Sequence, residues 1–169
     1  SGLSLPNLRT ALVIGHPGHE LMVHGWLNAT QPRVFIFTDG SGRSNQSRLG
    51  STTRILNQAG AKSSGVYGRL TDAAAYEAIL NHEFDLFLGL ARELCEAFAT
   101  EHIDYVAGDA FEGYNPVHDV CRLVINAAVT LNQRLGGHRV GNLEFSLVSQ
   151  PTVSHDQPHA GGICNFLDD

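Results

Sequence analysis

Short apolar runs alternate along this chain with longer segments of helical spacing, and this alternation limits the choice of fold more than any other feature. Runs typical of buried strands cover Thr10–Gly15, Arg33–Thr38, Gly65–Tyr67, Tyr105–Gly108 and Leu143–Val148. Segments typical of helices cover Glu20–Leu27, Ser47–Ala59, Asp72–Leu80, Phe84–Phe98 and His118–Leu135. Apolar strands separated by helices predict an α/β, three-layer fold, in which a mostly parallel sheet of about five strands has helices on both faces.

The length and composition suit one globular domain. A chain of 169 residues, 43% of them hydrophobic, can bury a substantial core, so we expect a single domain over 1–169, with an extension at 1–9 and an irregular tail at 149–169. The net charge is −6 and Lys and Arg do not cluster, which argues against a nucleic-acid partner. No apolar run reaches the roughly 18 residues of a membrane span. The three cysteines are far apart, so a cytoplasmic protein is expected.

Polar residues are concentrated directly after three of the predicted strands. The stretch HPGHE begins at His16, TDGSG begins at Thr38, and GDAFEGYNPVHD begins at Gly108. The carboxyl ends of parallel strands share one edge of a sheet, and open α/β folds bind their ligands at that edge. We therefore expect these three stretches to form the functional site.

Three histidines in these stretches have the arrangement of metal ligands. His16 and His19 are three positions apart where a strand passes into a helix, and His118 begins a helix after a later strand. If the strands that precede them are neighbours, the three imidazoles meet, and three protein ligands with one open position are typical of catalytic zinc. The alternative is that these histidines cap helices or face solvent, because an HxxH pair by itself is a weak signal.

The loop before His118 also carries groups that suit acid–base and oxyanion chemistry. Asp109 and Glu112 are carboxylates that could accept a proton. Tyr114 and Asn115 could donate hydrogen bonds to a developing oxyanion. The competing interpretation is that these residues form turns and helix caps, where Asp residues and Asn-Pro pairs are common.

The order of the three motifs resembles that of a known family. HPGHE after the first strand, TDG after the second and D-x-x-x-G-Y-N-P-x-H after the fourth look like the motifs of the PIG-L/LmbE-like family, over about Thr10 to Leu135. These proteins are metal-dependent N-acetyl-sugar deacetylases with a Rossmann-like α/β fold. The resemblance implies that His16, His19 and His118 occupy the three zinc-ligand positions, although the family usually has aspartate in place of His19.

The resemblance also implies roles for residues around the metal position. Tyr114 matches the tyrosine that handles the transition state, with one residue fewer before the closing histidine, and Asp109 matches the aspartate that precedes this loop. Arg48 is the counterpart of an arginine that contacts the substrate. The loop that contains Asp39 is expected to line a sugar or phosphate pocket, together with Arg43 or Arg48.

Two positions depart from the family pattern. Gly18 stands where the family has the aspartate that acts as general base, and Asn115 stands where it has a histidine. Another carboxylate would then have to accept the proton, and the nearest candidates are Glu112 and Glu20. We favour Glu112, because it belongs to the polar loop beside His118.

The sequence therefore leads to the hypothesis of a divergent, zinc-dependent hydrolase that cleaves a C–N amide bond with metal-bound water. Fe²⁺ or another divalent transition metal is the alternative to Zn²⁺. The expected partner is a small molecule, an N-acylated sugar or sugar conjugate, and the chain could also form a homo-oligomer. Because the usual base is missing, the competing hypotheses are a metal- or carbohydrate-binding module without catalysis and a metalloenzyme of different chemistry.

Overall fold

The computed structural model describes residues 8–148 and 165–166. Its strands form one sheet: β1 (Thr10–Ile14), β2 (Arg33–Thr38), β3 (Lys62–Leu70), β4 (Tyr105–Asp109), β5 (Gly141–Phe145) and β6 (Asn165–Phe166). The order across the sheet is β3-β2-β1-β4-β5-β6, with β1 to β5 parallel and β6 antiparallel to β5. The predicted α/β fold is confirmed. The short β6 was not predicted, and the rest of the tail expected at 149–169 lies outside the described residues.

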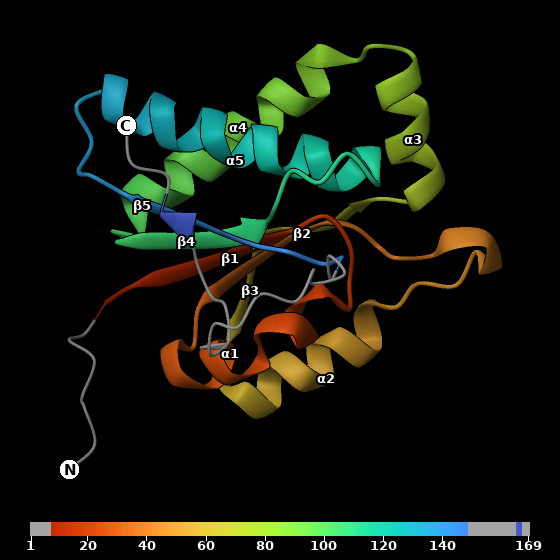
Figure 1. The fold of residues 1–169 in the computed structure, drawn as a ribbon, viewed down its shortest axis with the longest axis horizontal. Helices are drawn as coiled ribbons and strands as arrows, with labels where there is room; N and C mark the ends of the chain where they lie inside the picture. The colour runs from red at the N-terminus through yellow and green to blue at the C-terminus, as the bar shows by residue number, and fades with distance from the viewer. Residues whose placement is uncertain (1–7, 149–164, 167–169) are drawn as a thin grey trace, which may run out of the picture.

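Helices cover both faces of the sheet (Figure 1). One face carries α1 (His24–Thr30) and α2 (Leu49–Ala59), and the other carries α3 (Asp72–Leu80), α4 (Phe84–Thr100) and α5 (Pro116–Arg134). Short 3₁₀ helices, η1 (His19–Val23) and η2 (Gly42–Ser44), follow β1 and β2. All of β1 is buried, because alternate residues enter the two hydrophobic clusters on opposite faces of the sheet.

Several boundaries differ from the predicted ones, and the differences affect the site. The helix expected from Glu20 begins as the 3₁₀ turn η1, and α5 begins two residues before His118. Asn115 starts α5 by accepting a hydrogen bond from the backbone N–H of Val117 at 2.9 Å, and Pro116 takes the first helical position. The edge strand β3 extends well beyond the predicted Gly65–Tyr67. The prediction was too short because the strand is mostly polar, with a single buried residue, and so gives no apolar run.

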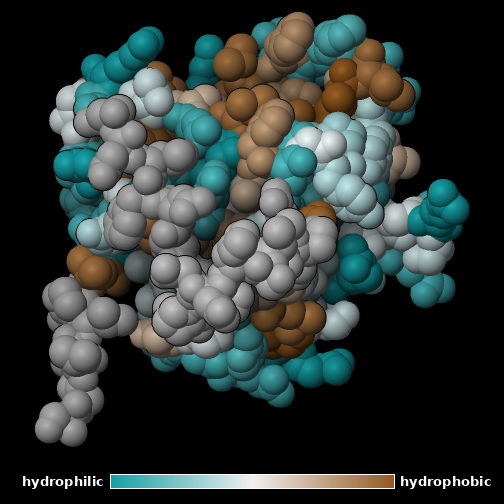
Figure 2. All heavy atoms as spheres, viewed as in Figure 1, coloured by the Kyte–Doolittle hydropathy of each residue, from teal (hydrophilic) through white to brown (hydrophobic). Residues whose placement is uncertain are grey.

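The apolar residues of α4 recur at helical spacing, but they are not equally buried along the helix. Leu94 and Phe98 are fully buried, whereas Phe84 is 67% and Leu88 is 49% exposed. The first turns of α4 lie farthest from the sheet in Figure 1, and Figure 2 shows hydrophobic side chains gathered over α3 and α4 at this side of the molecule. Within residues 8–148, no helix combines the length and apolarity that crossing a membrane requires.

Candidate metal centre

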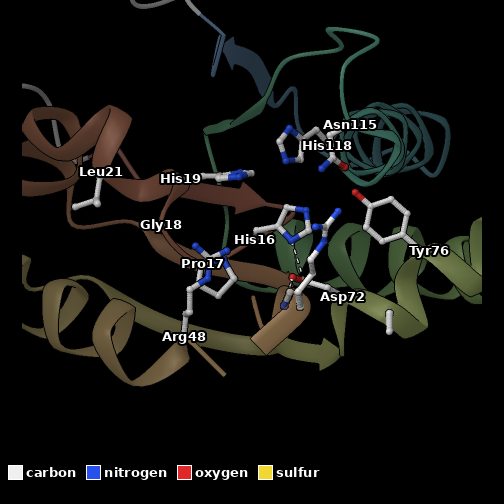
Figure 3. Close-up of a pocket in the computed structure, with 13 residues that line it drawn as sticks. His16, Pro17, Gly18, His19, Leu21, Arg48, Asp72, Tyr76, Asn115 and His118 are labelled. Atoms are coloured by element: carbon white, nitrogen blue, oxygen red, sulfur yellow. Dashed lines mark hydrogen bonds and ion pairs between the residues drawn. The ribbon is translucent and has the colours of Figure 1, made fainter. Parts of the chain in front are cut away.

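The sheet topology brings the three predicted ligand positions together. Strands β1 and β4 pair in parallel, so their carboxyl ends lie side by side. His16 follows β1, His19 begins η1, and His118 lies in the first turn of α5. Their ring centroids are 5.4 Å apart for His16 and His19, 5.1 Å for His16 and His118, and 4.5 Å for His19 and His118. The three imidazoles therefore form one cluster at the edge of the sheet (Figure 3).

The spacing of the rings is compatible with a shared metal ion, but the side chains as they stand do not form a complete site. Imidazoles that bind one tetrahedral ion through metal–nitrogen bonds of about 2.0–2.1 Å have ring centroids about 5 Å apart. The observed rings are nearly perpendicular to one another, with interplanar angles of 69–85°. As the side chains stand, no group of three or more His, Cys, Asp or Glu residues in the described part of the chain has a geometry that could hold a metal ion. The side chains would therefore have to reorient before their nitrogens could share one ion.

His16 is oriented by groups from β2 and α3. Its Nδ1 lies 2.8 Å from Oγ1 of Thr38 and 3.0 Å from Oδ1 of Asp72. Asp72 also accepts a hydrogen bond from the backbone N–H of Gly42 at 2.8 Å. Burial raises the pKa of Asp72, but hydrogen bonds from Thr38 and Gly42 and the charge of His16 outweigh it, and the pKa is lowered. The ionised carboxylate places the proton of His16 on Nδ1 and leaves Nε2 as the electron-pair donor.

His19 is oriented by a buried carboxylate at the end of β4. Its Nδ1 lies 2.9 Å and 3.0 Å from the two oxygens of Asp109, which also accepts the backbone N–H of Gly15 at 2.8 Å. Asp109 is fully buried, and Nε of the buried Arg122 donates to its backbone carbonyl at 2.7 Å. A histidine fixed through one ring nitrogen by a carboxylate is a common arrangement at metal sites, because the carboxylate sets the tautomer of the ligand.

Two buried ring nitrogens in the cluster lack a partner. Nε2 of His16 and Nδ1 of His118 make no hydrogen bond among the described residues. Burial, and to a lesser degree the neighbouring His19, lowers the pKa of His118 to about 4. Burial also lowers the pKa of His16, although Asp72 opposes the effect. Both imidazoles are therefore neutral at neutral pH, which is the form that binds metal, and an unpartnered buried nitrogen is costly unless a ligand satisfies it.

The histidines line an open pocket of about 840 Å³. Its volume is within the range of small-molecule sites. Arg48 reaches the pocket from the start of α2, and its Nε donates to the backbone carbonyl of Gly40 at 2.7 Å. Arg43 and Tyr76 also line the pocket. Both arginines thus border the histidine pocket, whereas Tyr76 was not indicated by any motif.

Two of the proposed catalytic residues lie at a different pocket. Glu112 and Tyr114 line a hollow with Ser146 and Val148, and neither lines the histidine pocket. The Glu112 carboxylate accepts hydrogen bonds from the backbone N–H groups of Leu147 and Val148 and from the hydroxyl of Ser146. Tyr114 is 74% exposed. Glu112 was favoured as the base for its place in the loop beside His118, but its carboxylate points toward the residues that follow β5.

The remaining predicted site residues, Glu20, Asp39 and Asn115, each make hydrogen bonds within their own loop or helix end. Glu20 is fully buried, and its carboxylate accepts the backbone N–H of Gly18 at 2.6 Å and the hydroxyl of Thr52 at 2.8 Å. Asp39 accepts the backbone N–H of Ser41 at 2.9 Å and is not among the residues that line the histidine pocket. Asn115 caps α5 and also lines that pocket. Of these residues, only Asn115 has a side chain placed to meet a bound ligand.

The backbone conformation at position 18 favours glycine. Gly18 has a φ of 106°, in the left-handed region that side chains strain, although a Cβ would meet nothing nearer than Nη1 of Arg48 at 3.7 Å. The residue therefore supplies a backbone conformation and leaves space beside Arg48. The departure from the family's aspartate is accompanied by a loop geometry that suits it.

Asp72 contacts the histidine cluster but was not among the predicted site residues. It follows the unexpectedly long β3, and therefore lies at the same carboxyl edge as the histidines. Had the end of β3 been placed at Leu70, the rule that polar residues after parallel strands form the site would have indicated Asp72.

Comparisons with known proteins give no relative for this chain: no protein-family model matches it, and no curated protein matches its sequence. The interpretation of the site therefore depends on its own geometry and on the motifs.

Proposed function

We propose that this chain is a divergent, PIG-L/LmbE-like hydrolase that cleaves a C–N amide bond, with His16, His19 and His118 holding a divalent ion such as Zn²⁺. The observation that supports this most is the cluster of three imidazoles, two of them tied through Nδ1 to the carboxylates of Asp72 and Asp109. When bound, the ion supplies Lewis-acid activation of water and of the substrate carbonyl. Fe²⁺ is the alternative ion, since neutral imidazole also suits iron.

The pocket residues bind and orient the substrate. Arg48 and Arg43 place cationic groups at the wall of the pocket, where they hold polar or anionic parts of an N-acylated sugar or sugar conjugate. Asn115 uses Oδ1 to cap α5, so its side-chain N–H₂ group is left to donate to the substrate. Asp72 and Asp109 hold the imidazoles of His16 and His19 in position through hydrogen bonds to Nδ1.

A second function is favoured by the lack of an available carboxylate base among the described residues that line the pocket. Among the described lining residues Asp72 is the only carboxylate. Its two oxygens already accept hydrogen bonds from Nδ1 of His16 and from the backbone N–H of Gly42. Gly18 contributes no side chain where the family has its base. These observations support a metal- or carbohydrate-binding module, or a metalloenzyme that performs chemistry without a carboxylate base.

Metal content tests the centre directly. Protein purified without a chelator is expected to contain about one divalent ion per chain, measured by mass spectrometry of the elements. His118→Ala is expected to lose the ion, because it removes one of three ligands. His24→Ala is the matched control, since His24 is an exposed histidine whose ring, among the described residues, pairs with Asn28 alone. Absence of metal from the wild-type protein, with added Zn²⁺ failing to bind, would contradict the proposal.

Acetate release from a panel of N-acetylated amino sugars then separates the two functions. Hydrolysis that is lost in His118→Ala and retained in His24→Ala supports the hydrolase. Stoichiometric metal with no acetate released from any substrate supports the second function.

A further inference from the structure

We propose that the phenolic hydroxyl of Tyr76 is the hydrogen-bond donor that holds the reacting carbonyl oxygen of the substrate. This inference rests on the proposed hydrolase function and adds a residue that none of the motifs contains. Tyr76 belongs to α3, far along the sequence from both His16 and His118, yet its side chain lines the same pocket.

The position of Tyr76 follows from the contact between α3 and His16. Asp72, in the first turn of α3, accepts a hydrogen bond from Nδ1 of His16 at 3.0 Å. Tyr76 comes four residues later, so its side chain and that of Asp72 project from the same face of the helix. Tyr76 therefore lies on the face of α3 that contacts His16, and its side chain lines the same pocket.

The Tyr76 hydroxyl is directed toward the cluster, and within the described part of the chain no hydrogen bond engages it. Figure 3 shows it pointing toward Asn115 and His118, with no hydrogen bond to any other residue drawn. Oδ1 of Asn115 accepts a hydrogen bond from the backbone N–H of Val117, so the N–H₂ group of the side chain remains as a donor. Two donors, one from α3 and one from the start of α5, thus stand beside the imidazoles. Paired donors of this kind stabilise the oxyanion that develops when an acyl group is attacked.

Tyr114, the tyrosine that the family resemblance implies for this role, lies elsewhere. It is 74% exposed and borders the hollow that also contains Glu112 and Ser146. A donor to an oxyanion must lie within hydrogen-bond reach of the reacting oxygen. Tyr76 lines the histidine pocket and Tyr114 does not, so the structure assigns the role to Tyr76.

The test is the binding of acetohydroxamate, whose carbonyl oxygen imitates that of a substrate, to protein loaded with one equivalent of Co²⁺. Binding is followed by the visible absorption of the cobalt. Tyr76→Phe removes only the hydroxyl and is expected to weaken binding about tenfold, the usual effect of losing one hydrogen bond. Its cobalt content and thermal unfolding temperature should equal those of the wild type. Tyr114→Phe is the matched control and should change the affinity less than about twofold.

The outcomes separate this inference from the function on which it rests. Equal affinity of the wild type and Tyr76→Phe, or a tenfold loss in Tyr114→Phe alone, overturns the role of Tyr76 and leaves the metal centre intact. Failure of the wild-type protein to bind Co²⁺ overturns the proposed function, and the role of Tyr76 with it.

Discussion

Acidification should destabilise the metal-free protein through His118, because the folded chain keeps this imidazole neutral. Its pKa falls from 6.5 to about 4, chiefly through burial, and this corresponds to about 3 kcal/mol of unfolding free energy. The unfolded chain takes up the proton below about pH 6.5 and the folded chain only near pH 4, so stability is full above pH 6.5 and falls as the pH decreases. About 2 kcal/mol of the contribution should be lost by pH 5.

Urea unfolding at pH 7 and pH 5, with a chelator present, measures this effect. Other groups also titrate in this range, so the quantity to compare is the pH dependence of the wild type minus that of His118→Gln. His24→Gln is the control, because its exposed histidine should leave the wild-type pH dependence unchanged. Equal loss of stability in the wild type and His118→Gln between pH 7 and pH 5 would refute the reasoning.

Two further substitutions test the surroundings of the cluster. Asp109→Asn removes the carboxylate that orients His19 and is expected to weaken Zn²⁺ binding about 10- to 100-fold, measured by competition with a coloured chelator. Unchanged affinity would show that Asp109 has no part in holding the site. Gly18→Asp introduces the aspartate that the PIG-L/LmbE-like motif has at this position, but it should lower the free energy of unfolding by about 1–2 kcal/mol, because the φ of residue 18 is 106°. Gly25→Asp, at a helical glycine with open space around it, is the control in urea unfolding, and equal stability of the two variants would contradict the argument.

The apolar segments predicted the fold correctly where burial on both sides made the pattern simple. Strands β1 and β2 are almost wholly buried, so nearly every residue is apolar and their bounds could be predicted closely. The pattern failed where one side faces solvent. In β3 the exposed polar residues concealed the strand, and in α4 the apolar residues Phe84 and Leu88 proved to be exposed. Local spacing cannot show whether a neighbouring element covers a given residue.

The prediction of the site residues was limited in the same way, because local sequence does not show which residues meet in space. The histidines were found because each follows a strand or opens a helix, and position at a strand end is visible in sequence. Glu112 was favoured for its place in the loop beside His118, and Tyr114 was implied by the family resemblance, but neither closeness along a loop nor a motif fixes the direction of a side chain. Asp72 and Tyr76 contribute from a helix whose position depends on the end of β3.

The sequence by itself determined the class of fold and the three imidazoles that could gather at one edge of the sheet, because periodic burial and strand-end positions are local properties of the chain. Only the tertiary structure decided which partners surround those imidazoles. It joined Asp72 to His16 and Asp109 to His19, brought Tyr76 to the pocket and turned Glu112 away from it. These contacts depend on the order of strands across the sheet and on the packing of α3, which arise from interactions between residues distant in the sequence.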